Sequence, residues 1–160
     1  MTTYISKNAI ERCSSSPTIA HPLNPRAKRR TLSLGDETGL SRCAMHLNIV
    51  APGDETTESH VHEFVDELVY ILSGSGSVFL DDVEHEVGAG DFIAFPARGP
   101  AHWMKNTGTT DLVYLVGGDR ADHDVCDYPR LEKRVYVSKV PDGRRLDFVD
   151  TKAVNSVRRP

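Results

Sequence analysis

Short runs of alternating apolar and polar residues fill the middle of this chain. From residue 29 onward, runs rich in Val, Ile, Leu and aromatic residues are separated by turn-forming residues about every 8 to 12 positions. Alternation with a period of two places successive side chains on opposite faces of a β-strand. The pattern predicts strands over residues 30–34, 42–50, 59–61, 67–72, 76–80, 85–87, 91–95, 102–106 and 112–117. Many short strands at such spacing indicate an all-β sandwich or barrel.

Turn-forming residues mark the ends of several of these strands. Asp81-Asp82 predicts a hairpin turn after Leu80, and the Gly- and Asp-containing stretch 88–91 predicts the next turn. Asn106-Thr107-Gly108 predicts another. In the strand 42–50, His46 and Asn48 lie on one face and Leu47 and Ile49 on the other. We expect the apolar face to pack inside the barrel or against a partner. His46 would then be an exposed or hydrogen-bonded histidine rather than a metal ligand.

The two ends of the chain differ from its middle. We divide the sequence into an N-terminal arm (1–28), a barrel (29–118) and a C-terminal extension that packs on the barrel (119–160). The first 30 residues are rich in serine, proline and basic residues and predict an extended arm across the barrel or a neighbouring subunit. We interpret the basic cluster of this arm as a solvated stretch rather than a ligand site; it comprises Arg26, Lys28, Arg29 and Arg30.

The C-terminal extension has no clear β-pattern at its start. Residues 119–127 are β-poor, and a run at 135–140 is followed by the turn 141–143 and by residues 145–149, which could return as a last strand. We therefore expect an irregular tail that covers one mouth of the barrel or pairs with an arm.

Composition limits the classes of partner. A chain of 160 residues and 17.7 kDa has the size of one domain. A net charge of −4 and a pI near 5.9 argue against nucleic acid or an anionic membrane as the main partner. Three widely spaced cysteines indicate a reducing compartment rather than a disulfide framework. Since no signal-like N-terminal segment or 18-residue apolar run is present, we expect a cytoplasmic protein.

Four residues carry the chemistry that the sequence suggests. His60 and His62 flank one residue in a predicted strand, so their imidazoles point to the same side. Glu67 follows after a short bend, and His102 begins a separate β-like run that could lie opposite. Imidazole suits Fe, Ni, Cu and Zn, and a carboxylate widens the choice to Mn. The spacing indicates one divalent transition metal site, for which we consider Mn, Fe, Ni and Zn.

Glycines, prolines and an asparagine frame these four residues. The first block reads Pro52-Gly53, six residues, His60-Val61-His62, four residues, Glu67, six residues and Gly74. The second block reads Gly90, five residues, Pro96, then Gly99-Pro100-Ala101-His102, three residues and Asn106. This frame resembles the two motifs of the cupin superfamily, separated by the short gap of its compact bacterial members. The resemblance implies a double-stranded β-helix, or jelly-roll, barrel with His60, His62, Glu67 and His102 as metal ligands.

The likeness extends to one subgroup of small bacterial cupins, some of which carry the provisional label of sugar-phosphate isomerase. It rests on Leu34 to Leu40, Asp66-Glu67, Gly90-Asp91-Phe92, Val116 to Arg120 and Asp127-Tyr128-Pro129. The sequence departs from the subgroup at Phe64-Val65, where His-Glu is common, and from the superfamily spacing by one extra residue before His60 and by Arg98. The apolar pair places a more hydrophobic patch beside the metal strand.

Several functions fit this ligand set. The hypotheses are a metal-dependent enzyme that moves a proton in a small organic acid or carbonyl compound, a sugar-phosphate isomerase or epimerase, an Fe(II) dioxygenase, and a non-catalytic metal or small-ligand binding module. Phe64, Val65, Phe79, Phe95, Trp103 and Met104 lie near the motifs, and some of them are expected to line the pocket. Arg98, Arg42 and Lys105 are the candidate cations for an anionic substrate. Leu68, Tyr70 and Leu72 predict an apolar outer face, so we expect a homodimer.

Overall fold

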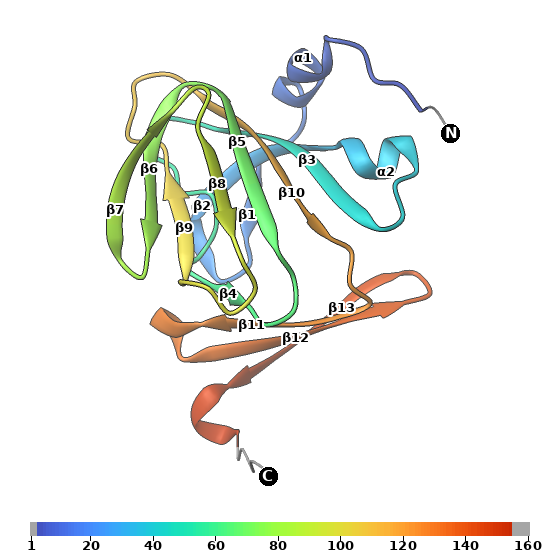
Figure 1. Cartoon of the computed structure of the whole chain (residues 1–160), viewed down its shortest axis with the longest axis vertical. Coiled ribbons are helices and arrows are strands. Elements are labelled where there is room, and N and C mark those ends of the chain that lie inside the picture. The colour runs from blue at the N-terminus through green and yellow to red at the C-terminus, as the bar shows by residue number, and fades with distance from the viewer. Residues whose placement is uncertain (1–2, 155–160) are drawn as a thin grey trace.

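The computed structural model describes residues 3–154, which fold into three antiparallel sheets (Figure 1). The largest sheet has six strands in the order β1 (Ile19–His21), β2 (Asn24–Ser33), β3 (Cys43–Val50), β10 (Leu112–Asp119), β5 (Glu67–Ser73) and β8 (Phe92–Phe95). A three-stranded sheet has the order β7 (Val83–Gly88), β6 (Ser75–Leu80) and β9 (His102–Lys105). All nine strands predicted for the barrel are present, with ends shifted by up to six residues.

A hydrophobic core joins these two sheets. Buried side chains of both sheets form one cluster: Val50, Val69, Ile71, Val78, Val87, Phe95, Met104, Leu112 and Tyr114. Two opposed antiparallel sheets with such a core form a jelly-roll barrel. The expected all-β barrel is confirmed. The expected boundary between the arm and the barrel, at residue 29, falls inside β2.

The predicted turns have the backbone that their residues favour. Asp81 and Asp82 have φ of 46° and 68°, as a two-residue hairpin turn between β6 and β7 requires. The fully buried Asn106 holds the loop between β9 and β10. Its amide group donates hydrogen bonds to the carbonyls of Val50 and Thr110, each at 2.8 Å, and its side-chain oxygen accepts the N–H of Gly108 at 3.0 Å. This loop therefore fixes where β9, the strand that begins with His102, ends.

The N-terminal arm covers the outer face of the large sheet. Helix α1 (Ala9–Ser14) places Cys13 against Leu47 and Ile49 of β3, in a second buried cluster that also contains Leu32 and Val113. The apolar face of β3 thus packs outward against the arm, and the opposite face, with His46, lines the barrel interior. The sequence analysis expected His46 to be exposed or hydrogen-bonded, but its side chain lines the cavity. Alternation shows that the two faces of β3 differ in polarity, but it does not show which face the arm covers.

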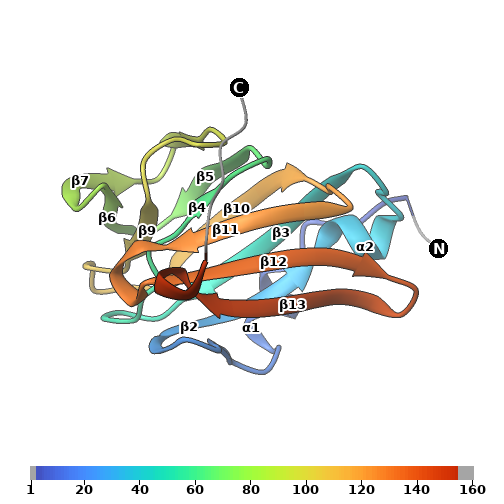
Figure 2. The same cartoon turned by 90° about the horizontal axis from the view of Figure 1, so that it is seen from below.

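The C-terminal segment is regular, contrary to the expected irregular tail. Strands β11 (His123–Tyr128), β12 (Lys133–Val140) and β13 (Gly143–Asp150) form a sheet with β4 (Val61–His62), in the order β13-β12-β11-β4. This sheet lies across one end of the barrel, as both views show (Figures 1 and 2). The charged residues of β11 concealed its alternation in the sequence.

The other elements are short. Helix α2 (Leu34–Thr38) lies between β2 and β3, and the 3₁₀ turns η1 (Pro129–Leu131) and η2 (Thr151–Ala153) flank β12 and β13. Within residues 3–154, no helix is long and apolar enough to cross a membrane.

Candidate metal centre

His60 and His102 face each other across an antiparallel bridge. The backbone N–H of His60 donates to the carbonyl of His102 at 3.2 Å, and the N–H of His102 donates to the carbonyl of His60 at 2.8 Å. Directly opposed residues of an antiparallel pair carry their side chains on the same face. The two imidazole centroids accordingly lie 4.6 Å apart. His60 and His102, which belong to different motifs and lie 42 positions apart along the chain, therefore meet at one backbone bridge.

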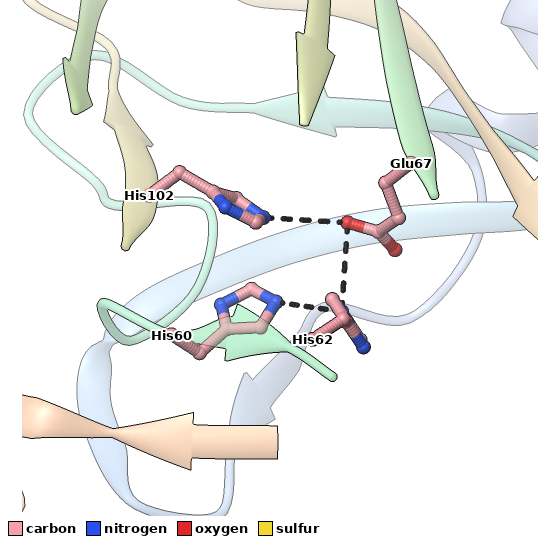
Figure 3. A group of neighbouring side chains, drawn as sticks. All are labelled: His60, His62, Glu67 and His102. Carbon is pink, nitrogen blue, oxygen red and sulfur yellow. Dashed lines mark hydrogen bonds and ion pairs between the residues drawn. The ribbon is translucent and has the colours of Figure 1, made fainter. Parts of the chain in front are cut away.

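His62 and Glu67 complete the cluster (Figure 3). His62 lies two residues beyond His60 on the same strand face, and the Nε2 atoms of these two residues are 3.1 Å apart. Glu67 begins β5, and its Oε2 lies 3.7 Å from Nε2 of His102 and 3.9 Å from Nε2 of His62. One ligand atom from each of the four residues lies within 4.8 Å of the others. The structure thus brings together all four site residues predicted from the sequence, in a group that could hold a metal ion.

Each histidine of the cluster is anchored through its other ring nitrogen. Nδ1 of His60 lies 2.9 Å from the carbonyl of Glu58, and Nδ1 of His102 lies 3.2 Å from the carbonyl of Pro100. Nδ1 of His62 lies 2.6 Å from Oδ2 of Asp124. Since carbonyl and carboxylate oxygens only accept, these contacts assign a proton to each Nδ1.

The three Nε2 atoms therefore turn toward the centre, where each imidazole in its neutral form presents a lone pair to a ligand. Nε2 of His102 is buried and has no hydrogen-bond partner among the residues that the structure describes. A buried nitrogen without a partner is costly unless a ligand satisfies it. Three imidazoles fixed in this tautomer, together with a carboxylate, fit a transition-metal ion.

Burial and charge set the protonation of the cluster. Burial, and secondarily the neighbouring His102, lowers the pKa of His60 to about 3, so His60 is neutral. Burial also opposes charge on His62, but the hydrogen bonds to Asp124 and Cys126 and the charge of Glu67 together outweigh it and raise the pKa to about 10. Burial would raise the pKa of Glu67, yet the three surrounding histidines, His102 first, lower it to about 2. In the metal-free protein, a proton on His62 therefore occupies the space between the imidazoles.

The C-terminal sheet supplies a second layer behind His62. Strand β11 pairs with β4, with Cys126 opposite His62. Asp124 is 3% exposed and accepts from two N–H donors, Nδ1–H of His62 at Oδ2 and the N–H of Phe64 at Oδ1, the latter at 3.1 Å, while the Cys126 thiol donates to Oδ2 at 3.6 Å. Cys126 Sγ lies 3.1 Å from the same Nδ1. The sequence analysis missed these residues, although Asp124, Cys126 and Tyr128 alternate with a period of two.

A cavity of about 340 Å³ extends from the cluster into the barrel. Its apolar wall comprises Val69, Phe95, Trp103, Met104 and Val116. Its polar wall comprises Arg29, Thr31, His46, Asn48 and Tyr114, and it also contacts His21, Thr56, Thr57, Cys126 and Tyr128. A second hollow of about 720 Å³ lies beside α2 and the β12–β13 hairpin and shares His46, His62 and Glu67 with the first. The cluster is therefore reached from two sides.

The predictions for the pocket lining were correct in part. Phe95, Trp103 and Met104 line the cavity and Val65 lines the second hollow, whereas Phe64 is 55% exposed on the surface and Phe79 stacks on Trp103 at 4.1 Å. The candidate cations Arg98, Arg42 and Lys105 line neither space. Arg98 instead forms an ion pair with Glu63 at 2.7 Å in an exposed loop.

One cation that the sequence analysis had assigned to a solvated stretch faces the cavity instead. Within residues 3–154, Arg29 of β2 is the only lysine or arginine that lines the 340 Å³ cavity. It lies two residues before Thr31, on the same strand face.

Comparison with known proteins places the cluster within a known protein family. The family model of the cupin domain matches residues 46–118, which contain the whole cluster. An oxalate-binding protein from Thermotoga maritima is 34% identical over 83 residues, which cover 48% of this chain and 68% of that protein. The chain belongs to the cupin family. The cluster therefore lies within the part of this cupin that its relatives share.

Two further similarities extend the comparison. The crystal structure of a protein from Acidithiobacillus ferrooxidans, provisionally named as a sugar phosphate isomerase, has a TM-score of 0.90 and 37% identity and covers 99% of this chain and 98% of its own. Protein SchB from Streptomyces halstedii is 32% identical over 90 residues, 55% of this chain and 64% of SchB. The chain thus spans less than two thirds of SchB. The first similarity includes both terminal segments of this cupin.

Proposed function

We propose that this cupin binds one divalent transition metal, Mn, Fe, Ni or Zn, through His60, His62, Glu67 and His102, and that it is an enzyme acting on a small organic acid or carbonyl compound. The observation that carries the proposal is the anchoring of all three histidines at Nδ1, which leaves three Nε2 atoms and Glu67 directed at one point. A bound divalent metal would polarise a carbonyl or hydroxyl group of the substrate.

The adjoining cavity supports a small and partly apolar substrate. One wall is apolar and the other carries hydroxyl, amide and imidazole groups, which is the usual composition of a small-molecule site. A phosphorylated sugar would favour several converging cations, since a phosphate is costly to desolvate unpaired. Arg29 is the single cation of the cavity lining. The name of the T. maritima relative, an oxalate-binding protein, is in keeping with an organic acid.

His46 supports a reaction that moves a proton. It lines both spaces beside the cluster but does not belong to the cluster itself. Burial is the main cause that lowers its pKa, so His46 is neutral near pH 7 and can accept a proton. A base next to a polarised carbonyl is what isomerisation or epimerisation of a carbonyl compound requires.

Three alternatives have some support. The A. ferrooxidans protein carries the name of a sugar phosphate isomerase, and proton transfer by His46 would serve that reaction as well. The oxalate-binding relative favours a binding module without catalysis. Two histidines and a carboxylate are also the ligands of Fe(II) oxygenases, so a dioxygenase remains a hypothesis.

Metal content after purification tests the proposal. We expect about one metal ion per wild-type chain by elemental analysis and a fall well below one in His62→Ala and His102→Ala. His85→Ala, an exposed histidine of β7, should keep full metal content and serves as the control. Stoichiometric metal in both site variants would contradict the assignment. An oxygen-uptake screen separates the dioxygenase from the other proposed functions. Iron with substrate-dependent uptake selects the dioxygenase, and zinc or manganese without uptake favours the isomerase-type enzymes or the binding module.

A further inference from the structure

Arg29 is a partly buried cation without a carboxylate partner. Its neighbours Arg26 and Arg30 pair with Glu55 and Asp111, at 3.1 and 2.7 Å. Within the described part of the chain, Arg29 forms no such ion pair, and its side chain donates one hydrogen bond, from Nη1 to the carbonyl of Thr56 at 2.9 Å. A guanidinium has five N–H donors, so most donors of this cavity-lining arginine have no partner among the described residues. A cation placed in this way favours an anionic ligand.

The polar wall places Arg29 and the metal cluster around the same space. Arg29 and Glu67 both line the 340 Å³ cavity, together with His46, Tyr114 and Tyr128. Arg29 comes from β2 and Glu67 from β5, so the cation and the metal cluster lie on different walls of one space. Arg29 thus belongs to the same cavity lining as the four cluster residues.

We propose that Arg29 forms a carboxylate subsite, and that the substrate is a small hydroxy- or oxo-dicarboxylate, with one end at the metal cluster and its second carboxylate on Arg29. This inference rests on the proposed metal-dependent function. A planar guanidinium binds a carboxylate through two parallel hydrogen bonds, whereas a phosphate would gain from additional cations that the cavity lining does not contain. A volume of about 340 Å³ lies at the small end of the range for ligand pockets, which suits a compound of a few carbon atoms.

Three compounds with the same hydroxy-acid head test the subsite. Malate ends in a carboxylate, 2-hydroxybutanoate ends in a methyl group, and 3-phosphoglycerate ends in a phosphate. Binding to the Mn²⁺-loaded protein is measured by calorimetry for wild type, Arg29→Gln, Arg29→Lys and, as a matched control, Arg98→Gln. We expect wild type to bind malate at least ~10-fold more tightly than 2-hydroxybutanoate, the scale of one charge-assisted pair.

The variants should separate the subsite from its surroundings. Arg29→Gln should weaken malate to the level of 2-hydroxybutanoate and leave 2-hydroxybutanoate itself unchanged, while Arg29→Lys keeps part of the preference. Arg98→Gln should bind all three compounds as wild type does. Equal binding of malate and 2-hydroxybutanoate by wild type, or a preference that survives Arg29→Gln, would overturn the subsite. Tighter binding of 3-phosphoglycerate than of malate through Arg29 would overturn the choice of a carboxylate.

A separate metal titration of each variant distinguishes this inference from the proposed function. If no variant binds metal but Arg29→Gln still abolishes malate binding, the metal-dependent function is wrong and the anion subsite stands. If metal binds with normal stoichiometry and malate has no advantage, the subsite is wrong and the metal site stands. Thermal denaturation of each variant shows whether the fold is kept.

Discussion

The contact between Asp124 and His62 leads to a prediction of metal affinity. The carboxylate accepts from two N–H donors, Nδ1–H of His62 at 2.6 Å and the backbone N–H of Phe64 at 3.1 Å, one on each oxygen. An asparagine has the same shape but only one accepting atom. If its oxygen faces His62, its NH₂ group meets the N–H of Phe64. If the amide is flipped, its NH₂ donates to Nδ1 and moves the imidazole proton to Nε2, where the metal would bind.

Both arrangements weaken the site, and the magnitude follows from the burial. Asp124 is 3% exposed, so water cannot readily replace the lost acceptor. Loss of such an outer-layer partner costs about 10- to 100-fold in metal affinity, or about 1.4 to 2.7 kcal/mol. We expect Asp124→Asn to reach the upper part of this range and Asp124→Ala the lower part, because alanine removes the acceptor but does not impose the wrong tautomer on His62.

A competition titration of each variant against a colorimetric chelator measures the change at fixed pH. The control is Asp127→Asn on the same strand, since Asp127 faces away from the cluster and pairs with Arg134 at 2.7 Å. The reasoning would be refuted if Asp124→Asn bound metal within about threefold of wild type. An equal loss in Asp127→Asn would point to a damaged strand β11 instead of a misplaced imidazole.

Three further predictions concern pH, assembly and packing. The pKa of His62 rises from 6.5 to about 10 in the folded metal-free protein, so its stabilising effect is complete below about pH 6.5 and is lost as the pH rises through 10. Urea unfolding of metal-free protein should therefore show a fall in stability between pH 7 and 10 that is absent in His62→Gln. Light scattering should give about twice the 17.7 kDa chain mass, and a monomeric wild type would contradict the homodimer. Phe92 is 62% exposed on the apolar outer face of β5 and β8, so Phe92→Asp should shift the protein toward monomer. Leu47→Ala should cost about 2 to 5 kcal/mol of unfolding free energy, because Leu47 is 2% exposed beneath α1, whereas a cost below 1 kcal/mol would show that the arm does not seal this face.

The four cluster residues could be predicted from the sequence because local rules place them. His60 and His62 share a strand face by the period of two, and the turn residues around His102 fix where β9 begins. By contrast, Asp124 reaches His62 across 62 positions of sequence through the pairing of β11 with β4. Local alternation does not specify such a pairing, and the acidic residues of β11 made the segment look like a loop.

Arg29 and His46 show a second limit of the sequence analysis. Alternation correctly separated the two faces of β3, but both a polar and an apolar face can be buried when each has something to cover it. The apolar face is covered by α1, a helix of six residues that is too short to give a clear helical periodicity in the sequence. Because α1 packs on the apolar outer face of β2 and β3, the polar residues of these strands point into the barrel. Arg29 then belongs to the cavity and not to solvent.

The two terminal segments thus shape the surroundings of the cluster. The arm seals the apolar outer face of the large sheet, which allows the inner face of β2 and β3 to carry Arg29, Thr31, His46 and Asn48 without loss of a hydrophobic core. The C-terminal sheet crosses the end of the barrel and brings Asp124 and Cys126 behind His62. The barrel motifs alone specify a cluster that could hold a metal ion. The choice of ligand and the basicity of His62 depend on residues that the terminal segments contribute or position. We therefore expect cupins that share the motifs but differ in these segments to differ in substrate.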